Sequence, residues 1–71
     1  MVLVFKTSVK SKEEIHSISP LLNAHVLPHG NWNFDLEDRD NILRVESNSV
    51  ESQQLISLLN ENGFDCHELE D

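Results

Sequence analysis

Cysteine, glycine and proline are scarce in this chain. It has one cysteine, Cys66, two glycines, two prolines and no tyrosine. A single cysteine excludes an internal disulfide and fits a reducing compartment. With glycine only at Gly30 and Gly63, the chain lacks a glycine-rich loop of the kind that cradles phosphate groups. The sequence therefore excludes a fold held by internal disulfides and a phosphate-loop nucleotide site.

Basic residues are also scarce. Five lysines and arginines stand against 13 aspartates and glutamates, which gives a formal net charge of −8. Affinity for nucleic acid comes largely from basic side chains that neutralise phosphates, and a negative protein is repelled by anionic lipid as well. We therefore expect no nucleic-acid partner and no membrane partner. A basic protein or a cation fits this charge, and so does a charge that only keeps the domain in solution.

Long apolar runs are missing too. The first run, at positions 2–5, is too short for the central segment of a signal peptide or for a membrane span, so we expect a cytoplasmic protein. The 71 residues are expected to form one domain, residues 1–71. A chain of this size buries only about 60 % of its unfolded surface, which leaves a thin core.

A helix-capping sequence is the clearest local motif. After a strand at positions 2–7, Ser11 stands three residues before Glu14, which predicts that the serine hydroxyl accepts from the Glu14 N–H while the carboxylate returns to the Ser11 N–H. Ile15, Ile18 and Leu22 follow at spacings of three and four, the pattern of one apolar helix face. Pro20 removes a hydrogen bond to the His16 carbonyl, so the helix is expected to end near Asn23.

The second half reads as a hairpin, a helix and a last strand. Alternation at positions 31–37 predicts a strand with its apolar side chains buried, namely Trp32, Phe34 and Leu36. A turn at 38–41 and a strand at 42–46 complete the hairpin. Caps at 47–49 and a stripe of Leu55, Ile56 and Leu59, with Leu58 at its margin, predict a helix that ends before Gly63. The last strand is expected at 64–69.

This order predicts an α+β fold. Strand, helix, strand, strand, helix and strand give two right-handed crossovers on one face of an antiparallel sheet. The architecture with these properties is the ferredoxin-like βαββαβ sandwich, whose four-stranded sheet has the order 4-1-3-2.

The chain resembles the heavy-metal-associated domain family over nearly its whole length. The resemblance rests on the order and spacing of five segments: Phe5-Lys6-Thr7, Ser19-Pro20-Leu21-Leu22, Trp32-Asn33-Phe34-Asp35-Leu36-Glu37, Leu43-Arg44-Val45-Glu46 and Asn62-Gly63-Phe64. The family implies the same fold and a metal held by a Cys-x-x-Cys pair where the chain enters the first helix. Those two positions correspond to Ser11 and Glu14 here. A hydroxyl and a carboxylate do not replace two thiolates for a soft copper ion, so the resemblance implies the fold without the thiolate site.

The remaining candidate ligands are scattered. Cys66 is expected to face the helices as a small buried side chain, while His67 points to the opposite face, so the two cannot hold one metal. His16 stands three residues after Glu13, a pair that could hold a cation weakly or have no role. His25 and His29 are expected at the other end of the sheet.

One group of carboxylates is expected to gather at a single end of the sandwich. The end of the first strand, the hairpin turn and the start of the last strand lie there in this topology, bringing together Glu13, Glu14, Glu37, Asp38, Asp40 and Asp65. Such an acidic pole would attract a basic partner or bind a divalent cation loosely. The alternative is that caps and turns favour acidic residues for local reasons.

No pattern in the chain indicates an enzyme, and we expect no catalytic residue, cofactor site or resident metal. No serine or cysteine stands with a histidine as nucleophile and base, and the arginines lie outside the first loop, where a phosphate-binding hydrolase of this fold would need one. The leading hypothesis is a binding or regulatory module. It would meet a protein partner or a second copy through the acidic pole, the sheet edges or an open face formed by Val2, Val4, Lys6, Ile42 and Arg44. The alternative is a metal-handling protein with carboxylate and histidine ligands.

Overall fold

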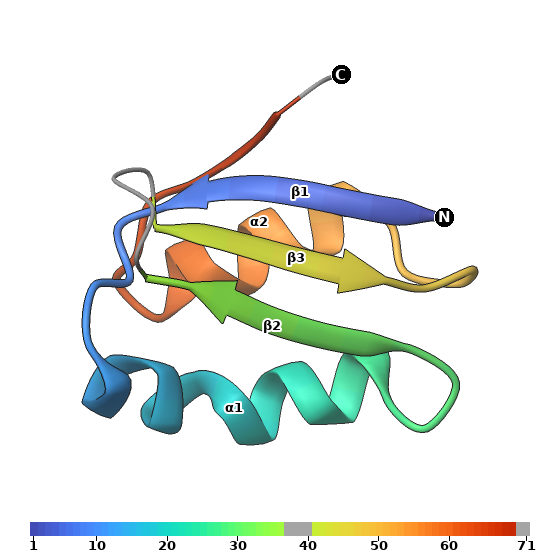
Figure 1. Cartoon of the computed structure of the whole chain (residues 1–71), viewed down its shortest axis with the longest axis horizontal. Coiled ribbons are helices and arrows are strands. Elements are labelled where there is room, and N and C mark those ends of the chain that lie inside the picture. The colour runs from blue at the N-terminus through green and yellow to red at the C-terminus, as the bar shows by residue number, and fades with distance from the viewer. Residues whose placement is uncertain (37–40, 70–71) are drawn as a thin grey trace.

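Four antiparallel strands form one sheet in the order β2-β3-β1-β4, which confirms the predicted topology (Figure 1). The computed structural model describes residues 1–36 and 41–69. In chain order the elements are β1 (Val2–Thr7), α1 (Lys12–Val26), β2 (Asn31–Asp35), β3 (Ile42–Glu46), α2 (Ser52–Glu61) and β4 (Cys66–Glu68). None of the helices in this described part is long and apolar enough to cross a membrane.

The register of the sheet decides which side chains meet the helices. In β1, Leu3 pairs with Val45 and Phe5 with Leu43 of β3, and all four are buried. Because side chains alternate across a strand, the residues between them lie on the other, open face. Both helices pack on the Leu3 and Phe5 side, where they contribute Ile18, Leu22, Val26, Leu55, Leu58 and Leu59 to one continuous core.

The first helix is longer than its sequence predicts. It continues past Pro20 and ends at Val26, three residues beyond the expected end at Asn23. The hydroxyl of Ser19 donates to the His16 carbonyl at 3.2 Å, the acceptor that Pro20 cannot serve. Val26 is 4 % exposed, so burial of its side chain holds the last turn in helical form.

The second strand is shorter and less buried than predicted. It ends at Asp35, so Leu36 follows the strand instead of belonging to it. Trp32, Phe34 and Leu36 are half-buried, because β2 forms an edge of the sheet and has a neighbouring strand on one side only. The third strand has its predicted bounds. Of the expected turn at 38–41, only Asn41 lies within the described residues.

The second helix begins differently from its prediction. Glu51 is the cap, and its N–H donates to Oε1 of Gln54 at 2.9 Å. Ser47, an expected cap, instead accepts from the N–H groups of Ser49 and Val50 and so shapes the turn before the helix. Leu58 is buried and Ile56 only half-buried, the reverse of their places in the predicted stripe. The helix packs beside β4 as well as on the core.

The end of the second helix agrees with its prediction. Gly63 has φ +87°, and its N–H donates to the Asn60 carbonyl while the Phe64 N–H donates to that of Leu59. The last strand begins only at Cys66, two residues later than expected, and ends at Glu68.

Candidate functional site

Hydrogen bonds to other parts of the chain hold the segment that joins β1 to α1 in place. Thr7 donates its hydroxyl to the Asn41 carbonyl at 2.7 Å and accepts the Val9 N–H at 3.2 Å. The side chain of Val9 is fully buried in the core, and this burial fixes the position of the middle of the segment. Ser8 accepts the Asp65 N–H at 2.8 Å and donates its own N–H to the Asp65 carbonyl, so the segment is also joined to the approach to β4.

The start of α1 is closed by the chain's own groups. Oγ of Ser11 accepts from the Glu14 N–H at 3.1 Å, as the capping motif predicts. The Glu14 carboxylate accepts from the N–H of Lys10 at 2.9 Å, whereas the prediction assigned it to the N–H of Ser11. Side chains of a first turn point back toward the helix start, and here the N–H in front of the carboxylate is that of Lys10. Ser11 and Glu14 therefore form a helix cap with backbone groups of the chain.

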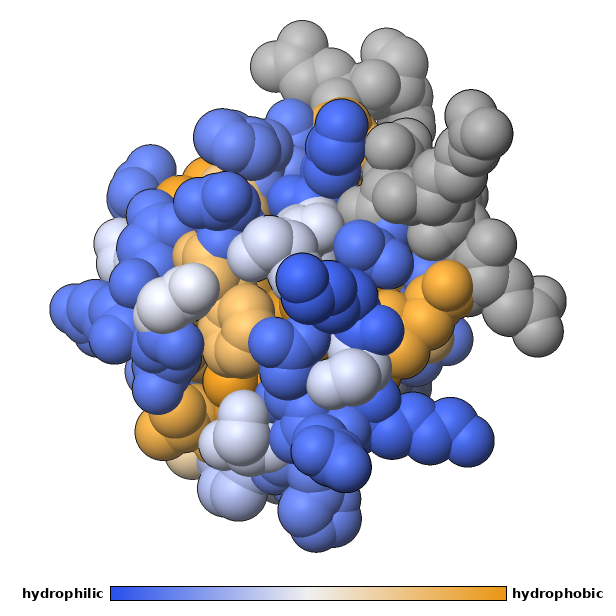
Figure 2. Space-filling model, turned by 90° about the vertical axis from the view of Figure 1, so that its left-hand side faces the viewer, coloured by the Kyte–Doolittle hydropathy of each residue, from blue (hydrophilic) through white to orange (hydrophobic). Residues whose placement is uncertain are grey.

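The predicted gathering of elements at one end is present. The end of β1, the start of α1 and the start of β4 lie together at the left of Figure 1. Of the six acidic side chains assigned to this end, Glu37, Asp38 and Asp40 lie outside the described residues. The other three, Glu13, Glu14 and Asp65, share the end with Lys10 and Lys12, which sequence reasoning did not weigh. Figure 2 views this end and shows a largely hydrophilic surface with separate apolar patches.

Cys66 lies in the core, as predicted. Its side chain is 3 % exposed, and burial raises the pKa of the thiol to about 11, well above its usual value of 9.0. A thiol in this state is protonated at neutral pH and is a poor nucleophile and metal ligand. The neighbouring His67 is exposed and pairs in register with Lys6 on the open face, so the two residues do face opposite ways.

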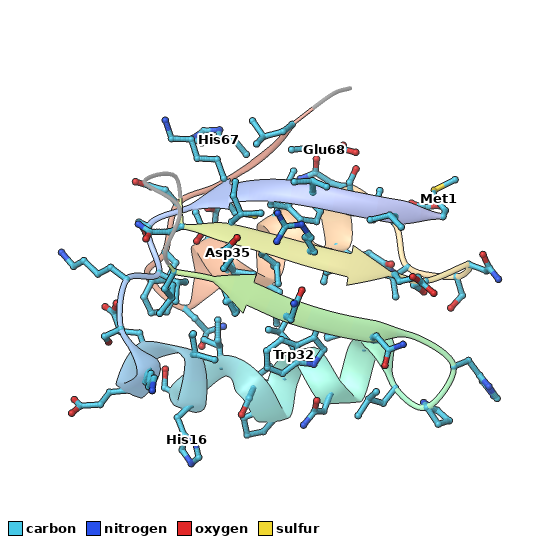
Figure 3. The ribbon with its side chains drawn as sticks, in the orientation of Figure 1. Met1, His16, Trp32, Asp35, His67 and Glu68 are labelled. Atoms are coloured by element: carbon cyan, nitrogen blue, oxygen red, sulfur yellow. The ribbon has the colours of Figure 1, made fainter. Side chains whose placement is uncertain are left out.

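The other histidines are exposed and separated. His16 and His67 lie on opposite sides of the molecule (Figure 3). Glu13 and His16 border one shallow depression on the outer side of α1, together with Lys12 and Ser17. In the described part of the chain, no group of three or more histidine, cysteine or carboxylate side chains is close enough to hold a metal ion.

The open face of the sheet carries a mixture of apolar and charged side chains. Val2, Lys6 and Arg44 are exposed there and Val4 is half-buried. Ile42 was also expected on this exposed patch, but it is only 5 % exposed, since it sits on a central strand with Lys6 and Asp35 on either side in register.

Arg44 has a partner on the neighbouring strand of the open face. Its Nη1 lies 3.6 Å from Oδ2 of Asp35, and both side chains are more than one-third exposed. Water screens such a pair, so its contribution to stability is at most about 1 kcal/mol.

The β2 edge carries a partly exposed aromatic pair that was not predicted from the sequence. The rings of Trp32 and Phe34 meet edge to face, with centroids 6.0 Å apart and planes at 78°. Both are half-buried, and Nε1 of Trp32 donates to Oδ1 of Asn23 on α1 at 2.8 Å. The signal for this edge was available, because a strand order of 4-1-3-2 places the second strand at the rim and leaves its aromatic side chains partly uncovered.

Comparison of the chain with protein-family models, with curated protein sequences and with solved structures finds no match.

Proposed function

We propose that this chain is a small non-catalytic binding module with a fold of the heavy-metal-associated type, in which a helix cap has replaced the thiolate metal loop. The observation that carries the proposal is the closure of the β1–α1 segment. Ser11 and Glu14 each accept a backbone N–H, at 3.1 Å and 2.9 Å, so groups that a ligand would use are already engaged within the chain.

The state of the chain's single thiol also supports a module that has no thiolate metal site. Cys66 is the only cysteine, it lies in the core, and the pKa of its thiol is about 11. Soft ions such as monovalent copper are held by paired thiolates. A module with these properties would act through its surface, on a protein partner, in a reducing compartment such as the cytoplasm. The net charge of −8 argues against a nucleic-acid partner.

Restoring two cysteines tests the lineage. In Ser11→Cys/Glu14→Cys, the thiols stand where the chain enters α1, and we expect one monovalent copper ion per chain where the unaltered protein holds none. Glu13→Cys/His16→Cys is the matched control, because it has the same spacing but lies on the exposed side of α1. The control should lose its copper to a competing chelator at a lower chelator concentration. Equal retention by both variants, or none by the loop variant, would show that the loop has no such geometry.

The second candidate function is metal handling through carboxylate and histidine ligands. It is favoured by the shared depression that Glu13 and His16 border on α1. Native mass spectrometry of the freshly purified protein, with and without a chelator, separates the two functions. The binding module is expected at the mass of the bare chain or its multiples. A stoichiometric metal ion that the chelator removes, and that His16→Gln abolishes, would support the second candidate instead.

A further inference from the structure

We propose that the partner of this module is a second copy of the same chain, joined by antiparallel pairing of the two β2 edges. Such pairing presupposes the proposed function, since it identifies the protein partner that the function requires. An edge strand offers a row of N–H and C=O groups to another strand, and edges that avoid pairing usually carry lysine, proline or a bulge. Positions 31–35 contain neither lysine nor proline. The other edge strand, β4, spans only three residues.

The side chains of β2 are complementary to themselves when the strand is turned around. With a two-fold axis at Asn33, the Asn33 side chains of both copies face each other. On the same open face Asn31 faces Asp35 of the second copy, so an amide can donate to a carboxylate. On the helix side Trp32 faces Phe34 of the second copy. Polar therefore meets polar and aromatic meets aromatic along all five residues, in one register.

The surface beside β2 has room for the aromatic side chains of a second copy. A depression of about 400 Å³ lies along β2, and its border combines the apolar Ile15, Phe34 and Leu36 with the polar or charged Lys12, Asn33, Asp35 and Arg44. In the proposed register, Trp32 of the second copy arrives opposite Phe34 and so at this depression. Figure 3 shows Trp32 between β2 and α1, where it can meet the incoming Phe34. Aromatic side chains at the centre of an interface supply much of its binding energy.

Charge also favours this edge for contact between copies. The chain has a net charge of −8, so two copies repel each other over most orientations. Within β2 only Asp35 is charged, and Arg44 of the adjacent strand lies 3.6 Å from its carboxylate. The β2 edge is thus a nearly neutral surface on an otherwise acidic molecule.

Sedimentation equilibrium from about 10 μM to about 1 mM, a range suited to small interfaces, tests the pairing. The unaltered chain is expected to pass from monomer to dimer. Asn33→Lys places two like charges side by side at the two-fold axis and should raise the dissociation constant at least about tenfold. Asn60→Lys is the matched control, because it makes the same charge change on the exposed surface of α2 and should leave the dimer intact.

Cross-linking fixes the register. Directly opposed residues of an antiparallel pair have Cβ atoms about 4.5–5.5 Å apart, so a small shift of the two strands brings them to disulfide distance. Asn33→Cys should therefore give a covalent dimer on mild oxidation, and Asn60→Cys should not. A chain that stays monomeric at every concentration would overturn the pairing while leaving the proposed function in place. A dimer that ignores Asn33→Lys and does not cross-link through Asn33→Cys would also overturn it. Discovery of a bound metal would instead overturn the proposed function itself.

Discussion

Ser11 is the only side chain whose oxygen accepts an N–H of the first turn of α1 in the described structure, through its 3.1 Å contact with Glu14. We expect Ser11→Ala to lower the free energy of unfolding by about 1 kcal/mol, because the Glu14 N–H loses its acceptor. The urea midpoint measures this loss. Ser17→Ala is the control: its hydroxyl donates to the Glu14 carbonyl from an exposed position, and its removal should change stability by less than about 0.5 kcal/mol. Equal losses would mean that the Ser11 cap stabilises the fold no more than the exposed Ser17 hydroxyl does.

Cys66 makes stability depend on pH in the alkaline range. Burial raises the pKa of its thiol from 9.0 to about 11, so between these values the unfolded chain has lost a proton that the folded chain keeps. The folded state is therefore favoured fully below pH 9.0, and this contribution disappears as the pH rises to about 11. Urea unfolding at several pH values should show the unaltered chain losing about 2 kcal/mol more than Cys66→Ala over this interval. Parallel curves for the two proteins would contradict the burial of the thiol.

At the scale of whole elements, the join between α1 and β2 is closely packed. A Cβ added at Gly30 would lie 2.5 Å from the carbonyl oxygen of Glu46 and 3.0 Å from Cγ1 of Val26. The backbone oxygen cannot swing aside, so Gly30→Ala should push β2 away from β3 and cost about 1–3 kcal/mol in a urea unfolding experiment.

Gly63 provides the contrast, because a Cβ there meets nothing within 4 Å and only its φ of +87° disfavours other residues. Gly63→Ala should cost about 1 kcal/mol for conformational reasons. Asparagine tolerates this backbone region, so Gly63→Asn should recover part of the loss, whereas Gly30→Asn should be worse than Gly30→Ala. Recovery at Gly30 would show that space is not the constraint there.

Local signals in the sequence account for most of the elements and fail where distant contacts decide. The bounds of β3 and the helix end at Gly63 depend on local sequence, and both were predicted correctly. The end of α1 was missed because it depends on burial of Val26 in the core and on the Ser19 hydroxyl replacing a lost N–H. Ile42 was placed on the exposed patch because a strand pattern does not reveal how neighbouring strands cover a residue.

For the molecule as a whole, the fold was more accessible from sequence than the site. The order of elements is enough to derive the sheet topology, and hence that Glu13, Glu14 and Asp65 share one end. The order of elements did not reveal that the Lys10 N–H donates to the Glu14 carboxylate, or that the Asp65 N–H donates to the Ser8 hydroxyl. Those contacts depend on the path of the β1–α1 segment, which is set by burial of Val9.

Salt dependence distinguishes the two kinds of protein partner that a chain of net charge −8 can have. Two identical acidic copies repel, and since the screening length falls to about 10 Å at 0.1 M salt, added salt should strengthen a dimer built on the nearly neutral β2 edge. We expect its dissociation constant to fall about threefold or more between low and high sodium chloride in sedimentation equilibrium. Asn60→Lys makes the net charge of each copy less negative, which weakens the repulsion and should flatten this dependence. A basic partner held at the acidic end would dissociate as salt rises. A dimer that weakened with salt would need ion pairs across its interface. The proposed register supplies none, because its facing pairs are Asn31–Asp35, Trp32–Phe34 and Asn33–Asn33.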